Sequence, residues 1–177
     1  MLYLPSEVWL QVFSYCSLQD IWVTLRRLNR QLAACAEDVT IQSTLLSRFT
    51  VAIRFPLEPT GTDGEPREQV TLSTITFTFR ELSSYNPTYA LFGSCLVHPR
   101  RHYAQATQHW EWLAANQLGE QQWRVQHGYE GEVRIVRLPR LIVAEGEGVW
   151  CDWRELFDAY CTRRPTVHGH AESEHAE

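Results

Sequence analysis

The spacing of hydrophobic residues changes its period near residue 48. Before that point apolar side chains recur at helical intervals, as at Val8, Val12 and Tyr15. From Phe49 to Phe55 large apolar side chains occupy every second position, which predicts a strand with one buried face. A chain of 177 residues can bury one core with a small helical module leaning on it. The order of the two patterns predicts an α+β fold.

Three short helices are predicted in residues 1–46. The first covers residues 6–15 behind Pro5, and the second begins after Ser17, which offers a capping oxygen. The third follows from Leu28. Each helix is too short to be stable alone, so the three must pack together, and such a helical module is typical of partner binding.

Several spaced positions in this region carry a family pattern. They are Leu4-Pro5, the run Val12-Phe13-Ser14-Tyr15, Leu18 with Asp20-Ile21, and the run Leu28-Asn29-Arg30-Gln31-Leu32. Together they resemble the F-box, especially its filamentous-fungal version, over roughly residues 3–38. Cys16 stands where a second Leu is common and Leu32 replaces a frequent aromatic residue, but both remain apolar.

The resemblance implies a docking role for the helical module. Its hydrophobic face would bind the Skp adaptor of an SCF-type ubiquitin ligase and, through the adaptor, a cullin. The implied docking residues are Leu4, Pro5, Val8, Val12, Leu18, Ile21, Leu25 and Leu28. Such a receptor holds an unknown protein substrate near a ubiquitin-charged enzyme, so it needs neither a catalytic side chain nor a cofactor.

A second interpretation stays open, in which the chain is a scaffold or ligand-binding protein without a ligase role. The same leucines and valines would then form the module's own core against the rest of the chain. Trp9 and Trp22 bear on the choice: their exposure would favour docking, and their burial would favour internal packing.

The remainder of the chain, residues 47–162, is predicted to form an antiparallel sheet of five or six strands with two helices against one face. The strands are expected at residues 49–55, 70–80 (with a bulge), 89–97, 123–127, 133–135 and 141–145. One helix begins near Tyr103 and ends at Gly119, and Asp152 caps a final helix with an apolar stripe. The loop from Pro56 to Glu68 is expected to be exposed, and residues 163–177 to be a disordered tail. Three segments are similar to regions that accompany fungal F-boxes and imply no activity: 89–92, 122–128 and 149–154.

Composition excludes several classes of function. The five cysteines form no CxxC pair, which argues against a disulfide framework and a cysteine-rich zinc site. A net charge of -5 makes nucleic acid a poor partner. No apolar run approaches the ~20 residues that span a bilayer, so we expect no membrane contact and a location in the cytoplasm, the nucleus or both.

Candidate chemical sites are weak. His98 and His102 flank a proline that opposes a shared metal geometry, and His168, His170 and His175 sit in the tail, so no metal is predicted. We find no nucleophile elbow, P-loop, dinucleotide fingerprint or zincin spacing, and therefore predict no enzyme activity.

Two further thiol pairings and one tryptophan complete the candidates. Cys95 with His98, or Cys151 with Asp152, could form a reactive thiol, although a buried structural Cys is the more common case. Trp112 lies two residues from Trp110 and so on another side of its helix, which makes Trp112 the candidate for substrate contact.

All sixteen basic residues are Arg, and the chain contains no Lys. A coding bias toward Arg is one explanation, since Arg serves as well as Lys on a solvated surface. The other is functional: a receptor beside an active ubiquitin enzyme would limit its own modification if it offered no ε-amine.

Overall fold

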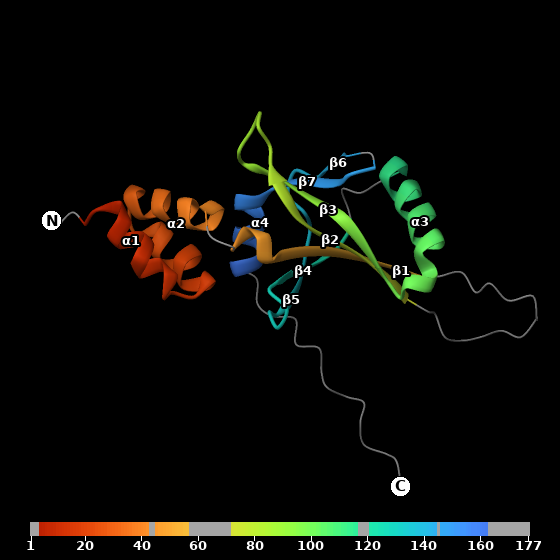
Figure 1. Cartoon of the computed structure of the whole chain (residues 1–177), viewed down its shortest axis with the longest axis horizontal. Coiled ribbons are helices and arrows are strands. Elements are labelled where there is room, and N and C mark those ends of the chain that lie inside the picture. The colour runs from red at the N-terminus through yellow and green to blue at the C-terminus, as the bar shows by residue number, and fades with distance from the viewer. Residues whose placement is uncertain (1–3, 43–44, 57–71, 117–120, 145, 163–177) are drawn as a thin grey trace, which may run out of the picture.

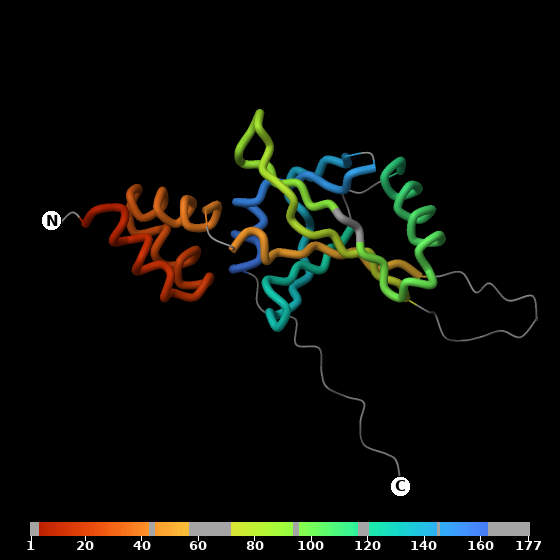
Figure 2. Tube along the Cα trace, in the orientation of Figure 1, coloured from red at the N-terminus to blue at the C-terminus, as the bar shows by residue number. Residues whose placement is uncertain are grey.

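The computed structural model describes residues 4–42, 45–56, 72–116, 121–144 and 146–162, and it has the predicted α+β architecture. A helical module at one end joins a seven-stranded sheet, with helix α4 (Trp153–Thr162) between them and helix α3 (Tyr103–Asn116) at the far end (Figure 1). Figure 2 shows the orange part of the helical module beside blue α4, so segments far apart in the sequence lie next to one another. The predicted exposed loop at 56–68 and the predicted disordered tail at 163–177 fall almost wholly outside the described residues.

Four helical segments make up the module, and their bounds are α1 Ser6–Ser14, the π-helix η1 Asp20–Thr24, the 3-10 turn η2 Leu25–Arg27 and α2 Arg30–Gln42. The predicted cap after α1 is confirmed, because the Asp20 amide donates to the Ser17 hydroxyl at 3.1 Å. The Leu32 amide donates to the Asn29 side chain at 2.9 Å, so Asn29 caps α2. The module buries its own small core of Phe13, Ile21, Leu32, Cys35, Ala36 and Val39.

The π-helix serves two cores at once. Ile21 is 1% exposed in the core of the module, while its neighbour Trp22 is 0% exposed and belongs to the core of the sheet. An extra residue per turn is uncommon in helices and is associated with special side-chain placement. Here it accompanies two consecutive buried side chains that pack against different partners.

The sheet is antiparallel throughout, with strand order β5-β4-β1-β2-β3-β7-β6. The strands are β1 Phe49–Pro56, β2 Leu72–Leu82, β3 Tyr89–His98, β4 Trp123–His127, β5 Val133–Val136, β6 Ile142–Ala144 and β7 Gly148–Asp152. The described part of the chain therefore has seven strands, more than the expected five or six. The strand that was not expected is β7. Gly146 and Gly148 form the tight turn into this strand, whereas the sequence pattern had indicated only a break before the last helix.

The predicted antiparallel pairing of β1 with β2 is present, and β2 also carries the expected irregularity. Its register against β3 shifts between Thr76 and Thr78 and again between Phe79 and Glu81. In the sequence, the apolar positions change from even to odd numbers between Leu72 and Ile75, which had indicated a bulge there. Both register shifts lie later in the strand.

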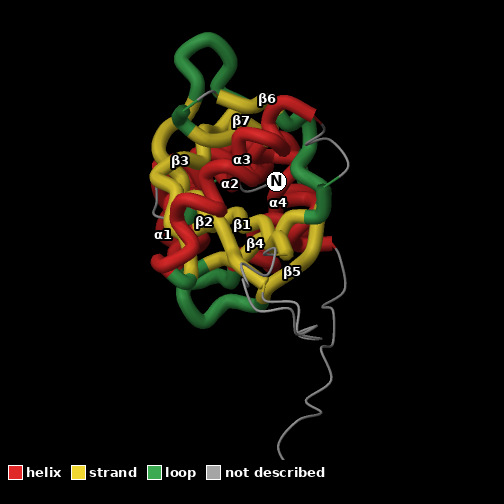
Figure 3. Tube along the Cα trace, turned by 90° about the vertical axis from the view of Figure 1, so that its right-hand side faces the viewer, coloured by secondary structure: helices red, strands yellow, loops and turns green. Residues whose placement is uncertain are grey.

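Both helices cover one face of the sheet, as predicted. Phe49 of β1 packs on Phe157 of α4 with ring centroids 4.3 Å apart, and Phe55 of the same strand stacks on His109 of α3 at 4.5 Å. Positions 49 and 55 share a strand face, so the two helices lie on the same side. In the end-on view of Figure 3 the yellow strands lie around α3 and α4.

The last helix begins as predicted. The Asp152 carboxylate accepts the amides of Arg154 and Glu155 at 3.0 and 3.2 Å and thereby caps α4. The apolar stripe of this helix is buried at Trp153, Leu156, Phe157 and Tyr160. Two 3-10 turns complete the described elements, η3 Leu46–Arg48 and η4 Arg100–His102.

Candidate functional site

The eight residues implied in docking differ in exposure. Leu4, Val8 and Val12 are each close to 40% exposed and Leu28 is 64% exposed. Pro5 is also exposed. We call these five exposed side chains the outer apolar face of the module. Leu4, Val8 and Val12 follow one another at helical spacing along the start of the chain, and Leu28 precedes α2, whose Gln31 reaches the Leu4 carbonyl.

The other three predicted residues lie inward. Ile21 is buried in the core of the module, Leu25 packs partly against that core, and Leu18 packs partly against the core of the sheet. Tyr15, which was not among the eight, is 91% exposed at the end of α1. Its signal in the sequence was the same helical spacing that singled out Val8 and Val12.

A hydrogen bond fixes the start of the outer apolar face. The Gln31 side-chain amide donates to the Leu4 carbonyl at 2.9 Å and ties the chain before α1 to the first turn of α2. The apolar side chains on either side of this tie remain accessible. Their exposure is what a surface that meets a second polypeptide requires.

Trp22 forms the joint between the module and the sheet. Its ring lies 5.7 Å from Trp153 and 4.9 Å from Phe157, and its indole N–H donates to Asp158 at 2.8 Å. Arg26 stacks over the same indole at 4.2 Å and pairs with Asp158 at 3.1 Å. Of the two diagnostic tryptophans, Trp22 thus favours internal packing.

A second ion-pair bridge flanks this joint. Glu37 of α2 pairs with Arg26 at 3.4 Å and with Arg154 of α4 at 2.7 Å. Trp9 is half-buried within the module, with its ring 6.1 Å from that of Phe13. Its exposure therefore favours neither docking nor internal packing. The module is therefore both a docking candidate on its outer side and a packed partner of the sheet on its inner side.

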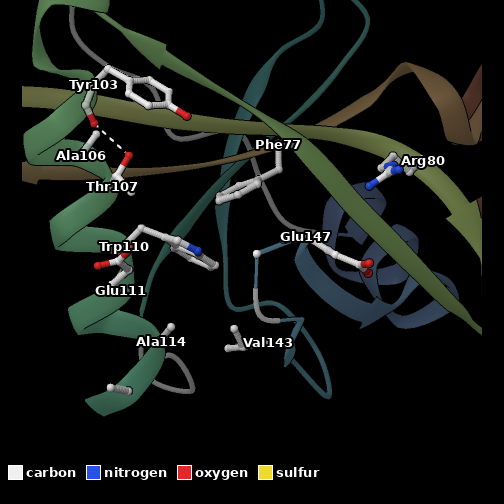
Figure 4. Close-up of a pocket in the computed structure, with 13 residues that line it drawn as sticks. Phe77, Arg80, Tyr103, Ala106, Thr107, Trp110, Glu111, Ala114, Val143 and Glu147 are labelled. Carbon is white, nitrogen blue, oxygen red and sulfur yellow. Dashed lines mark hydrogen bonds between the residues drawn. The ribbon is translucent and has the colours of Figure 1, made fainter.

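The described residues also form a pocket of about 870 Å³ between α3, β2 and the turn from β6 to β7 (Figure 4). Its apolar walls include Phe77, Trp110 and Val143. The ring centroids of Phe77 and Trp110 are 4.9 Å apart. Arg80 and Glu147 lie together on the side of the pocket away from α3. Glu111 of α3 also lines the pocket, so its lining carries both charge signs.

Sequence reasoning did not find this pocket. Trp112 is 59% exposed as expected, but it stacks toward His109 at 6.0 Å and does not line the pocket, whereas Trp110 does. The available signal was the row Ala106, Trp110 and Ala114, which places one large side chain between two small ones on one helix face. The strands that complete the pocket could not be assigned to it from the sequence.

The cysteines near the sheet are structural. Burial, with the charge of Asp152 second, raises the pKa of the Cys151 thiol far above its usual range. Burial likewise raises the pKa of Cys161 to about 12. Both thiols stay protonated at neutral pH, so the suggested Cys151–Asp152 pair has no thiolate to react. The Cys95 side chain lies outside the described residues.

The histidine candidates do not assemble into a site. Within the described ranges no group of three or more His, Cys, Asp or Glu side chains has the arrangement to hold a metal ion. His102 accepts a hydrogen bond from Arg101 at 3.1 Å, and His98 is exposed. His168, His170 and His175 lie outside the described residues.

Comparison with known proteins bears on the helical module. The sequence model of the F-box domain matches residues 1–42. Comparisons with curated proteins and with solved structures returned no match. No helix in the described part of the chain is long and apolar enough to cross a bilayer. An F-box implies binding to the Skp adaptor, and F-box proteins are typically non-catalytic adaptors. The α1-to-α2 module at the start of this chain is an F-box domain.

Proposed function

We propose that this chain is the substrate-receptor subunit of an SCF-type cullin-RING ubiquitin ligase. The observation that carries the proposal is the match of residues 1–42 to the F-box domain, together with the apolar side chains left exposed on the outer face of that module. The fungal type of the F-box, a boundary near residue 46, and a location in the cytoplasm or nucleus belong to the same proposal.

The docking surface in this proposal consists of the outer apolar face: Leu4, Pro5, Val8, Val12 and Leu28. Leu18 and Leu25 are half-buried and would contribute only their edges, and buried Ile21 would support the surface from below. Burying exposed aliphatic side chains contributes roughly 25 cal/mol per Å² of apolar surface removed from water. The role needs no catalytic residue, because the receptor acts by raising the local concentration of substrate.

The substrate would bind the sheet with its two helices. Trp112 remains a proposed contact because its indole is more than half exposed at the outer side of α3. The joint at Trp22 supports this arrangement, since a receptor must hold its substrate at a steady position relative to the adaptor.

Capture by purified Skp adaptor tests the docking proposal. The variant with Pro5→Ala and Val12→Asp should lose capture by at least about tenfold, because a carboxylate at Val12 would have to be desolvated in an apolar interface. Ile142→Asp is the matched control, as it places the same charge on another exposed aliphatic position, in β6, and should be captured like the unmodified chain.

The same experiment addresses the alternative, a scaffold or ligand-binding protein whose first helices only complete the fold. The complete burial of Trp22 against α4 favours that alternative. Unmodified chain that the Skp adaptor fails to capture, while its circular dichroism shows it folded, would decide for the alternative.

A further inference from the structure

The face of the sheet opposite α3 and α4 carries a cluster of positive charge. Side chains alternate between the two faces along β1, so Ala52 and Arg54 point to this face. Arg124 of β4 lies directly opposite Ala52 and therefore on the same face. Thr74 lies opposite Arg54, and Thr76 lies opposite Ala52. These residues form the basic open face.

The two arginines are diagonal neighbours. Arg54 is two residues beyond Ala52, and Arg124 is across from it, which corresponds to a separation of about 7–8 Å at the side-chain base. Ala52 between them is small, so both guanidinium groups can reach neighbouring groups of one bound molecule over it. Burial, and second the charge of Arg54, lower the pKa of Arg124, which agrees with two like charges close together.

No acidic group in the described part of the chain balances these charges. Neither arginine has an ion pair with any residue the structure describes. The open-face positions of β1, β4 and β2 as far as Thr78 contain no Asp or Glu, and Glu81 follows only after the register shifts. On a chain with a net charge of -5, this face is therefore locally positive against an acidic background.

The chemistry of the face matches a carboxylate-bearing peptide. Guanidinium groups donate paired hydrogen bonds to carboxylates, and the threonine hydroxyls of β2 can donate or accept. Leu96 lies opposite Thr76 on the same face and is 60% exposed, which adds an apolar contact beside the charges. Side chains of an extended segment repeat about every 6.8 Å on one side, close to the spacing of the two arginines.

We propose that the basic open face binds an extended, acidic segment of a polypeptide, with carboxylates on alternate residues paired to Arg54 and Arg124. Only the identification of that segment as part of a ligase substrate rests on the proposed receptor function. The face itself would bind such a segment whether or not the chain meets the Skp adaptor.

A nucleic acid is the less suitable occupant. Single strands are held by aromatic platforms along a charged groove. The described open-face positions around Arg54 and Arg124 hold threonine, alanine, leucine, isoleucine and glutamine, and the imidazole of His98, opposite Thr74, is the one aromatic ring among them. The net negative charge of the chain would also repel a long polyanion.

Fluorescence anisotropy with the full chain tests the inference. The probe is a short fluorescein-labelled peptide with Glu at every second position, and its partner peptide has Gln at those positions. Arg54→Gln and Arg124→Gln should each weaken binding of the Glu peptide by about tenfold, and added salt should weaken it further. Arg27→Gln, an exposed arginine in the helical module, removes the same charge elsewhere and should change affinity by less than about twofold.

Three results would overturn the inference: equal binding of the Glu and Gln peptides, affinity unchanged in both open-face variants, or tighter binding of a labelled DNA single strand with the same sensitivity to these variants. Thermal unfolding midpoints close to that of the unmodified chain would show that the variants are folded. Adaptor capture separates the two proposals. Peptide binding without capture contradicts only the receptor role, and capture without peptide binding contradicts only the basic open face.

Discussion

Trp22 shows how one side chain can join two parts of the chain that sequence patterns describe separately. It sits in a helical module but packs against Trp153 and Phe157, which come more than a hundred residues later. Its spacing within the module gave no sign of those partners, because contacts between distant segments are not encoded in local periodicity. The exposed Val8 and Val12 show the opposite case, since helical spacing alone identified both.

Substituting Trp22 should loosen the joint between module and sheet. Trp22→Ala removes a fully buried indole and leaves the Asp158 carboxylate without that donor, for an expected loss of about 3–5 kcal/mol in unfolding free energy. Trp112→Ala removes the same side chain from an exposed position and should cost less than about 0.5 kcal/mol. Chemical denaturation measures both, and similar losses for the two variants would contradict the assigned burial.

At the scale of elements, local signals predicted most of the architecture. The strand at Phe49–Pro56, the capping role of Asp152 and the apolar stripe of α4 all follow from alternation, capping chemistry and helical spacing. Strand β7 was missed because its five residues run directly into α4, and a short apolar run between a glycine turn and a cap resembles a loop. The pocket beside Trp110 was missed because α3 meets β2 and the β6–β7 turn only after folding.

The turn into β7 depends on Gly148. Its φ of +136° is outside the range that other residues adopt, and a Cβ there would lie 2.0 Å from the Phe92 carbonyl oxygen. Gly148→Ala should therefore separate β7 from β3 and destabilise the fold by more than about 2 kcal/mol.

Gly128 provides the comparison for that substitution. It also has a positive φ, +71°, but a Cβ at this position would meet no atom within 4 Å, so Gly128→Asn should cost less than about 1 kcal/mol. Thermal unfolding of both variants distinguishes close packing from backbone conformation alone. Equal losses at the two positions would contradict the close approach of β7 to β3.

For the whole molecule, the joint at Trp22 makes the F-box and the sheet one packed body. Asp158 of α4 binds Trp22 and Arg26 of the module. Glu37 of the module pairs with Arg154 of α4. A segment bound to the sheet would accordingly keep one orientation relative to the docking helices. That property suits a receptor whose contribution is position rather than chemistry.

The missing lysines belong to this scale as well. In a reconstituted ligase the unmodified chain should show little self-ubiquitination, and Arg67→Lys should increase it by introducing an ε-amine in the segment predicted as an exposed loop, which lies outside the described residues. Arg134→Lys is the control, because that position is largely buried beside Glu132 and should gain less. Equal modification of the unmodified chain and Arg67→Lys, measured by immunoblot, would show that the composition has no protective effect.

The strand order also determines what the sheet offers to other copies of the chain. Its longest members, β2 and β3 with eleven and ten residues, are enclosed, while the two borders are β5 with four residues and β6 with three. Free backbone amides and carbonyls along a border are what recruit foreign strands into growing fibrils. Because its edge strands are so short, the sheet offers few free backbone groups on which a foreign strand could pair. This holds even though its central strands are rich in the β-branched and aromatic residues that amyloid favours.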